Sequence, residues 1–297
     1  MDPGEAAPGA PVPGGPATVA PASGASAPGD PGPGAPRAGR SASGRPASGS
    51  RPPGGAALDD PVRTSLRGNH AALARWDGRA GTYAPGAATF CTVPAVPDPA
   101  DWAGLARLLG PGGLADMFSC PAAPPADWEP VFTLEGRQMV RLDGDIGRAS
   151  AGGFGGSAGR PPVPDGPEGP RVVELGAADV PEMLGLVALT APGPFGPRTH
   201  RLGTYLGVRD GGRLVAMAGE RLRPPGWTEI SAVCTAPGAR GRGYAGLLVG
   251  TLAARITARG ERPFLHVVEE NTAAIALYER LGFALRARVV FRGFRVP

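Results

Sequence analysis

Apolar and polar positions form a regular succession of blocks in the second half of the chain. Apolar runs rich in β-branched residues predict strands at 172–175, 204–209, 213–221, 227–235 and 263–268, with one or two closing strands within 284–296. Apolar residues at helical spacing predict helices at 179–190, 245–258 and 272–281. The second half is therefore predicted to contain both strands and helices.

The first half predicts a smaller α+β lobe at 57–142. Asp60 followed by Pro61 is typical of a helix start, because aspartate caps the first turn and proline fits it. An apolar stripe at helical spacing continues this helix through Val62, Leu66, His70, Leu73 and Trp76. A second helix is predicted at 98–109, with strands at 81–83, 89–93, 115–120 and 129–142. We expect His70 to be a hydrogen-bonded core residue and not a catalyst.

Composition separates two further segments from these lobes. Residues 1–56 are almost all Ala, Gly, Pro and Ser, and they cannot bury enough apolar surface to offset a conformational entropy of about 1–2 kcal/mol per residue. We therefore expect a disordered N-terminal tail. Residues 143–170 are dense in Gly and Pro and are predicted to be a linker. Its glycine-rich part, 152–159, has neither a preceding strand nor a following helix, so a phosphate loop is not favoured there.

A glycine-containing turn joins the predicted strand 227–235 to the predicted helix 245–258. It reads Arg240-Gly241-Arg242-Gly243-Tyr244-Ala245. The free N–H groups at the start of a helix attract anions, glycines allow a ligand to approach the backbone, and arginines add positive charge. The pattern therefore predicts a pyrophosphate site. A Walker loop is excluded because the chain has no lysine, and the third glycine and the acidic residue of a dinucleotide motif are missing.

The same turn resembles the acyl-CoA loop, Arg/Gln-x-x-Gly-x-Gly/Ala, of the GNAT N-acetyltransferase superfamily. A second segment, 266–283, matches at the expected distance and contains Asn271, Tyr278 and Gly282-Phe283. The amino-acid sequence of 202–283 looks most like that of the glycine N-acyltransferase-like branch of this superfamily. The resemblance implies a GNAT domain at 171–297, whose order of strands and helices is that of the superfamily's α+β fold with a mixed sheet. It also implies an acyltransferase of class EC 2.3.1.-. Such an enzyme moves an acetyl or short acyl group from acetyl-CoA to an amine of a small molecule or a peptide.

The resemblance also implies roles for individual residues. Cofactor binding falls to the turn residues Arg240, Gly241, Arg242, Gly243, Tyr244 and Ala245, and to the backbone of Val233, Cys234 and Thr235, where the family's strand splays from its neighbour. Asn271 could hydrogen-bond the cofactor arm. Tyr278 lies on the same helix face and could protonate the leaving thiolate, although it could also simply pack in the core.

The base that deprotonates the amine is left open by the sequence. Glu229 stands eleven residues before Arg240, which matches the strand glutamate that serves as base in histone-acetylating relatives. Glu220 on the preceding strand is the alternative, and a mechanism without a dedicated base is the third. A half-buried carboxylate would have a raised pKa suited to this work. Cys234 is expected to be a buried structural residue, and His266 is a candidate for substrate contact.

The cysteines, the histidines and the apolar stretches indicate the environment of the protein and the kinds of partner that it lacks. Three isolated cysteines form no CxxC pair, which indicates a reducing, cytoplasmic environment. The histidines and cysteines show no metal signature, and no apolar stretch approaches the length of about 20 residues needed to span a membrane. The sequence therefore predicts neither a metal nor a membrane partner. It leaves a homodimer open.

The positive charge lies mainly in the second half of the chain. Residues 171–297 contain 17 arginines against 10 acidic residues, which suits a ligand with several phosphates. A nucleic-acid partner is not favoured, because the arginines do not form a basic helix with interleaved aromatic residues. The alternative to an enzyme is a catalytically silent acyl-CoA-binding module that regulates a partner.

Overall fold

The computed structural model describes residues 55–141 and 171–297, all within one compact unit that spans Pro52–Pro297. The predicted linker at 143–170 and the predicted disordered tail, apart from residues 55 and 56, lie outside the described residues. A 3₁₀ turn at Gly55–Leu58 begins the described part.

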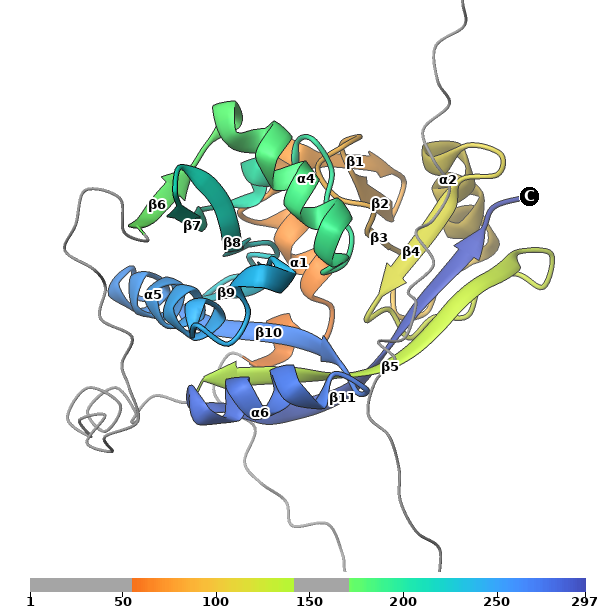
Figure 1. Cartoon of the computed structure of the whole chain (residues 1–297). Coiled ribbons are helices and arrows are strands. Elements are labelled where there is room, and N and C mark those ends of the chain that lie inside the picture. Colours follow the sequence, from red (N-terminus) through yellow and green to blue (C-terminus); the bar gives the residue numbers. More distant parts are fainter. Residues whose placement is uncertain (1–54, 142–170) are drawn as a thin grey trace, which may run out of the picture. The chain divides into compact units, whose positions relative to one another are not determined.

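An eight-stranded mixed sheet organises this unit (Figure 1). Its strands follow in the spatial order β4 (Leu114–Phe118), β11 (Phe283–Arg295), β5 (Glu129–Arg141), β10 (Arg262–Val268), β9 (Trp227–Thr235), β8 (Arg213–Glu220), β7 (Tyr205–Asp210) and β6 (Arg171–Leu175). Among these described strands only the β9–β10 pair is parallel. A separate three-stranded sheet contains β1 (Ala74–Asp77), β2 (Ala80–Tyr83) and β3 (Cys91–Thr92). The predicted α+β class with a mixed sheet is confirmed.

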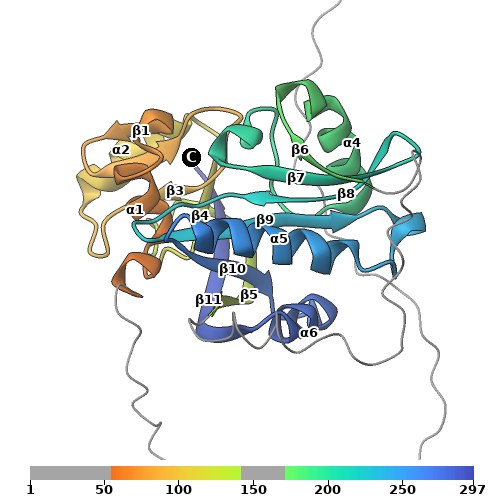
Figure 2. The same ribbon diagram turned by 90° about the vertical axis from the view of Figure 1, so that its left-hand side faces the viewer.

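Helices cover both faces of the large sheet (Figures 1 and 2). The described α-helices are α1 (Pro61–Arg67), α2 (Pro99–Leu109), α4 (Val180–Thr190), α5 (Tyr244–Ala258) and α6 (Thr272–Arg280). Neighbouring residues of β7 show the two faces, because side chains alternate along a strand. Leu206 packs in the core cluster that contains the α5 and α6 residues, whereas Tyr205 packs in the cluster that contains Met183 and Leu186 of α4. We call these the α5 face and the α4 face.

One sequence prediction in the first half is wrong. The helix that begins with Asp60 and Pro61 ends at Arg67, and Trp76 lies in β1 and not on the helical stripe. The start is as predicted, since the Asp60 side chain accepts a hydrogen bond from the Arg63 N–H at 3.0 Å. The chain turns after Gly68 and pairs β1 with β2, so long-range strand pairing prevails over local helical spacing.

His70 follows this turn and is the buried core residue that the sequence predicts. Its Nδ1 lies 2.9 Å from the Tyr83 hydroxyl and its Nε2 lies 3.0 Å from the Leu202 carbonyl oxygen. Burial lowers the pKa of His70 to about 4. The other predicted helices and strands of the described residues agree with the structure to within a few residues, and 227–235 coincides with β9.

The strand β5 joins the two halves of the chain in one sheet. It pairs antiparallel with β11 along most of its length and, on its other side, with β10 over residues 136–140. At Gly136 there is no room for a side chain, since a Cβ atom would lie about 2.8 Å from the Val267 carbonyl oxygen and would also clash with the Phe291 ring. A strand from the first half of the chain is thus packed between two strands of the second half.

Candidate functional site

The parallel strands β9 and β10 part soon after they pair. Their register joins only 227–229 with 262–264, although β9 continues to Thr235 and β10 to Val268. Beyond this point β10 stays paired with β5, and β9 stays paired with β8. Between Ile230 and Thr235, the edge of β9 that faces β10 therefore has no partner among the described strands. We call this divergence the fork. Glu229 is the last residue of β9 that pairs with β10, and we call it the vertex of the fork.

A β-bulge in β9 lies just beyond the vertex. Ser231 is opposite Gly219 and Cys234 is opposite Met217, so two residues of β9 face one of β8, and Ala232 has a φ of 52°. Bulges of this kind bend a strand and redirect its side chains. Cys234 is 7% exposed in the cluster on the α4 face, and burial raises the pKa of its thiol. It is a buried structural cysteine, as expected.

The turn after β9 leaves the start of α5 uncapped. Gly241 and Gly243 both have a φ of 78°, a conformation that favours glycine, and α5 begins at Tyr244. No side chain caps this helix, and the N–H groups of Tyr244, Ala245 and Gly246 have no acceptor among the described residues. Free N–H groups at the positive end of a helix dipole form an anion site.

Two arginines flank this anion site. The Arg242 guanidinium donates to Asp210 Oδ2 at 2.9 Å, so part of its charge is compensated. Arg240 lies close to the Thr235 carbonyl oxygen, at 3.4 Å, and has no ion pair within the described part of the chain. The predicted residues 240–245 thus form one turn beside the fork, with one uncompensated positive charge.

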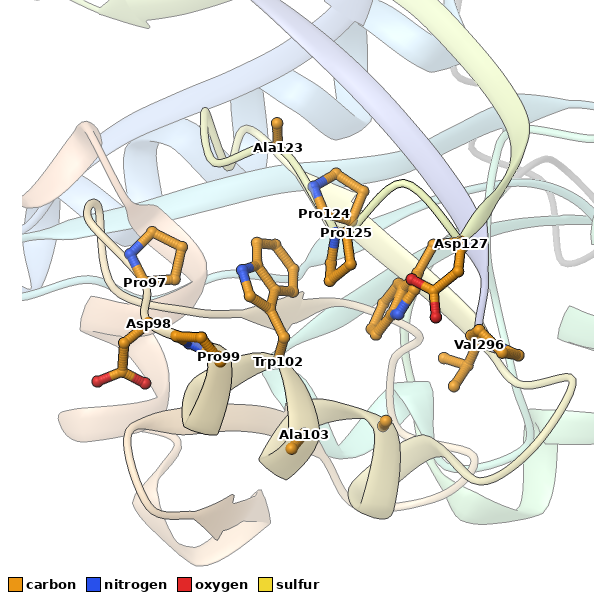
Figure 3. Close-up of a pocket in the computed structure, with 13 residues that line it drawn as sticks. Pro97, Asp98, Pro99, Trp102, Ala103, Ala123, Pro124, Pro125, Asp127 and Val296 are labelled. Atoms are coloured by element: carbon orange, nitrogen blue, oxygen red, sulfur yellow. The ribbon is translucent and has the colours of Figure 1, made fainter.

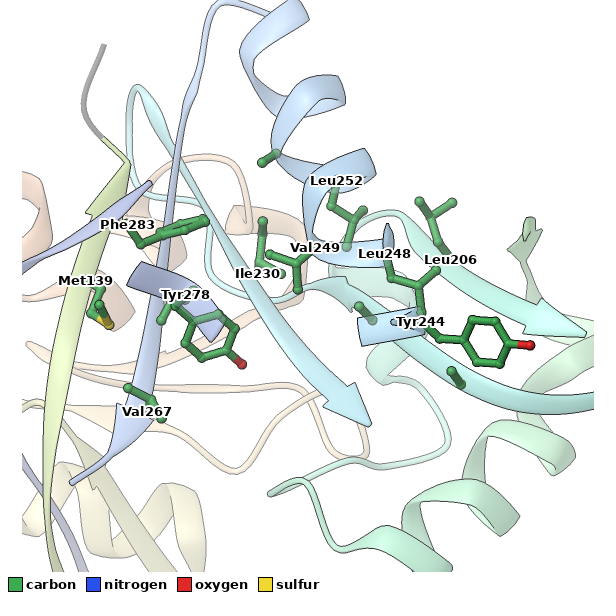
Figure 4. Packing of buried hydrophobic residues seen from close by; sticks show 14 of the residues in the cluster. Met139, Leu206, Ile230, Tyr244, Leu248, Val249, Leu252, Val267, Tyr278 and Phe283 are labelled. Carbon is green, nitrogen blue, oxygen red and sulfur yellow. The ribbon is translucent and has the colours of Figure 1, made fainter. Parts of the chain in front are cut away.

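Tyr278 lies on α6 and packs on the α5 face of the fork. It is 7% exposed, in a cluster that includes Ile230 of β9 and Val267 of β10 (Figure 4). Its hydroxyl has no hydrogen-bond partner among the described residues, and burial raises its pKa to about 12. The ring therefore serves as a core residue, while the hydroxyl stays protonated near neutral pH and free to donate a hydrogen bond.

Asn271 has a structural role that sequence spacing did not anticipate. It is the N-cap of α6, and its Oδ1 accepts a hydrogen bond from the Ala274 N–H at 3.1 Å. The residue is exposed. Its predicted contact with the cofactor arm would have to use the amide N–H groups, because the cap occupies the oxygen.

The two candidate bases lie on opposite faces of the sheet. Glu220 is 3% exposed and turns to the α5 face, where it pairs with Arg259 at 2.8 Å and accepts from the Thr204 N–H. Glu229 is fully buried on the α4 face, at the vertex of the fork. Both were expected to be half-buried, and both are buried and ion-paired.

Glu229 is bound through both carboxylate oxygens. The Arg221 guanidinium donates Nε to Oε2 at 2.9 Å and an amino group to Oε1 at 2.6 Å, and His266 Nδ1 lies 2.7 Å from Oε1. Arg221 and His266 hold the pKa of Glu229 at about 2, although burial by itself would raise it. This is the opposite of the raised pKa that we expected for a base. Its role as a base stays a prediction.

The sequence did not indicate Arg221 as a partner of Glu229, and it offered His266 only as a candidate for substrate contact. The His266 side chain is only 1% exposed and lies between Glu229 and the amide of Gln138. Gln138 comes from the first half of the chain, 128 residues before His266. The contacts of His266 join strands that are 37 and 128 residues apart along the chain, so no local pattern could reveal them. Arg221 is only eight residues from Glu229, but apolar periodicity does not show which charged side chains pair across neighbouring segments.

A cavity of about 670 Å³ lies away from these residues (Figure 3). Its walls include Trp102 and Trp128, with Asp98, Asp127 and several prolines at its sides. None of its lining residues is among the predicted site residues. Asp98 already caps α2 and pairs with Arg79 at 2.7 Å, so it is engaged within the fold.

Residues 55–141 and 171–297 contain neither a cluster of metal-binding side chains nor a helix that could cross a membrane. In these ranges no three or more His, Cys, Asp or Glu side chains gather as metal ligands. None of the helices there is both long enough and apolar enough to cross a bilayer.

In this structure the sheet forks beside the uncapped start of α5, and comparisons with known proteins identify relatives that share the fold. The family model FR47-like protein matches residues 205–291. A structure described as an acetyltransferase of the GNAT family, from Novosphingobium aromaticivorans, is 38% identical, with a TM-score of 0.66. The match covers 81% of this chain and 98% of that one.

A second solved structure shares the fold at lower identity. A GCN5-related N-acetyltransferase from Kribbella flavida is 16% identical, with a TM-score of 0.50, and the match covers 81% of this chain and 96% of the other. A search of curated proteins found no match. On the strength of the Novosphingobium relative, the chain belongs to the GNAT family of acetyltransferases.

Proposed function

We propose that this protein transfers an acetyl or other short acyl group from acyl-CoA directly to the amine of a small molecule or peptide. The observation that carries the proposal is the fork of β9 and β10 beside the uncapped start of α5. Membership of the GNAT family supports the general activity. We also propose that the protein belongs to the glycine N-acyltransferase-like branch. This assignment rests on the amino-acid sequence of 202–283 alone.

The residues of the turn fit the phosphates of CoA. The N–H groups of Tyr244, Ala245 and Gly246 are without acceptors in the described structure, and Arg240 has no ion pair there. We propose that residues 240–245 hold the pyrophosphate. The unpartnered edge of Val233, Cys234 and Thr235 offers backbone groups to the amide-containing arm.

When bound, acyl-CoA supplies a thioester that a free amine attacks without a covalent enzyme intermediate. The chain's own residues then have two tasks: one proton leaves the amine, and one proton is given to the thiolate. We propose that Tyr278 gives the proton to the thiolate, because its hydroxyl is protonated near neutral pH and has no partner among the described residues. Asn271 is proposed to contact the arm through its free amide N–H groups.

The path of the amine proton separates the three hypotheses about the base. Glu229 is anionic and fully held by Arg221 and His266, and Glu220 is paired with Arg259 on the α5 face. These contacts favour the mechanism without a dedicated carboxylate base. The pH–rate profiles of Glu229→Gln and Glu220→Gln decide the matter, because the variant that loses the acidic limb identifies the base.

The test of the proposed function is a calorimetric titration of acetyl-CoA and CoA into the full chain. We expect micromolar binding, about −8 kcal/mol, that Arg240→Glu abolishes. Arg75→Glu is the matched control, since it makes the same charge change at an exposed position of β1. Absence of binding by folded wild-type protein would overturn the proposal.

An assay of thiol release with candidate amines then distinguishes an enzyme from the silent binding module. Amine-dependent release of CoA supports the transferase. If acetyl-CoA binds but no amine in a broad panel of amino acids, polyamines and peptides releases the thiol, the alternative of a regulatory acyl-CoA-binding module is favoured.

A further inference from the structure

The vertex of the fork is held by a buried chain of hydrogen bonds on the α4 face. It runs from Arg221 through Glu229 and His266 to Gln138, with distances of 2.6, 2.7 and 3.1 Å between successive partners. Glu229 belongs to β9, His266 to β10 and Gln138 to β5. These hydrogen bonds thus connect β9 and β10, which part at the fork, with β5, which stays paired with β10.

The partners of Gln138 determine which nitrogen of His266 carries the proton. The Gln138 Oε1 accepts from the Arg286 guanidinium at 2.6 Å, and its Nε2 donates to the Leu58 carbonyl oxygen at 2.9 Å. The amide N–H₂ group therefore faces His266, whose Nε2 must accept. A neutral ring then carries its proton on Nδ1 and donates it to Glu229. Burial lowers the pKa of His266, which keeps the ring neutral.

Aromatic rings pack around this network of hydrogen bonds. The Arg221 guanidinium lies over the rings of Phe90 and Phe118, at 4.9 and 4.7 Å from their centroids. Phe118 also packs edge-on against His266, at 4.7 Å. With side-chain exposures of 1% for His266 and 0% for Glu229, neither group reaches a bound amine in this conformation.

We propose that His266 is a positioning residue of the acyl-transfer site: by bridging Glu229 and Gln138 it fixes where β9 and β10 part. The inference rests on the proposed function, in which the acyl-bearing arm lies along the unpartnered edge of β9. The width of the fork at its vertex then sets how that arm lies against Tyr278, on the opposite face of the sheet.

The affinities of the His266→Phe variant for two ligands test the positioning role separately from turnover. Acetyl-CoA engages the turn and the fork, whereas its nucleotide half, 3′-phospho-ADP, engages the turn only. We expect His266→Phe to weaken acetyl-CoA about tenfold, in line with the loss of a hydrogen bond to a charged group, and to leave the affinity for 3′-phospho-ADP unchanged. Turnover should fall about 100-fold, as expected for a misplaced reacting group.

His70→Phe is the matched control. His70 is also buried and also uses both ring nitrogens, but its partners are Tyr83 and Leu202 and not the strands of the fork. It should lower stability without changing the ratio of the two affinities. His266→Asn is the second variant, since it keeps a donor near the position of Nδ1 and should recover part of the acetyl-CoA affinity even if His266→Phe does not fold.

The outcomes separate the two proposals. Equal affinity ratios in wild type, His266→Phe and His266→Asn would overturn the positioning role, even if turnover falls. If wild-type protein binds acetyl-CoA but acylates no amine, the transferase proposal fails, and the affinity ratio still decides the role of His266. If wild-type protein binds neither ligand, both proposals fail.

Discussion

At the scale of the residue, Glu229 shows how neighbours determine what a carboxylate can do. Burial alone would favour its neutral form, but two contacts from Arg221 and one from His266 stabilise the charge, and the pKa falls to about 2. A carboxylate in this state is a poor proton acceptor near neutral pH. Its negative charge instead compensates the buried positive charge of Arg221.

Glu229→Gln should therefore be strongly destabilising at neutral pH. It leaves the Arg221 guanidinium buried without its counter-charge, which costs about 3–5 kcal/mol. Because the folded pKa of Glu229 is below its unfolded value of 4.5, its contribution is complete above pH 4.5 and is lost as the pH falls towards 2. Denaturant unfolding of both proteins across this range should show their difference shrinking with acidity. A constant difference would contradict this assignment.

Tyr278→Phe tests the other residue with a proposed role in proton transfer. It removes the hydroxyl and keeps the ring that packs against Phe283 at 6.2 Å. We expect kcat to fall by about 100-fold or more, as for loss of a general acid, with little change in acetyl-CoA affinity. Steady-state kinetics together with calorimetry measure both. Unchanged turnover would assign Tyr278 to the core alone.

At the scale of the element, the turn before α5 depends on its backbone conformation. A Cβ atom on Gly241 or Gly243 would meet nothing within 4 Å, yet both residues have a φ of 78°. A side chain is therefore disfavoured by the backbone itself and not by crowding. The sequence predicted this turn well, because its glycines and its flanking strand and helix are local signals.

Gly241→Ala and Gly243→Ala should each cost about 1–2 kcal/mol in the ligand-competent turn and weaken acetyl-CoA binding about tenfold. Gly238→Ala is the matched control, because Gly238 has equal space around it but no positive φ. Calorimetry of the three variants provides the comparison. Equal effects at all three positions would show that lost flexibility, and not the left-handed conformation, is responsible.

At the scale of the whole molecule, β5 makes the second half of the chain dependent on the first. It separates β10 from β11 in the sheet, and its Gln138 completes the hydrogen bonds of His266. Without it, both neighbouring strands would have unpaired edges and an exposed apolar surface. The predicted family domain at 171–297 therefore lacks two strands of its own sheet, the edge strand β4 and the interior strand β5.

We expect a chain of 171–297 to be unfolded or aggregated, and a chain that begins at Pro52 to fold. Circular dichroism and urea unfolding compare the two. In the full chain, Gly136→Ala should destabilise by about 1–3 kcal/mol through crowding against Phe291 and Val267. Gly185→Ala, in α4 with open space around it, should not destabilise. Cooperative unfolding of 171–297 alone would refute the dependence on β5.

The sequence by itself determined the elements of the second half, the turn at 240–245 and the resemblance to the GNAT superfamily, because these signals lie within short stretches of chain. Other features of the protein became clear only in the tertiary structure. It placed β5 between β10 and β11, ended the first helix at Arg67, and enclosed Glu229 with Arg221 and His266. Strand order depends on partners that are distant along the chain, and the pKa of Glu229 depends on how Arg221 and His266 are placed around it in space. The periodicity of apolar residues predicts neither.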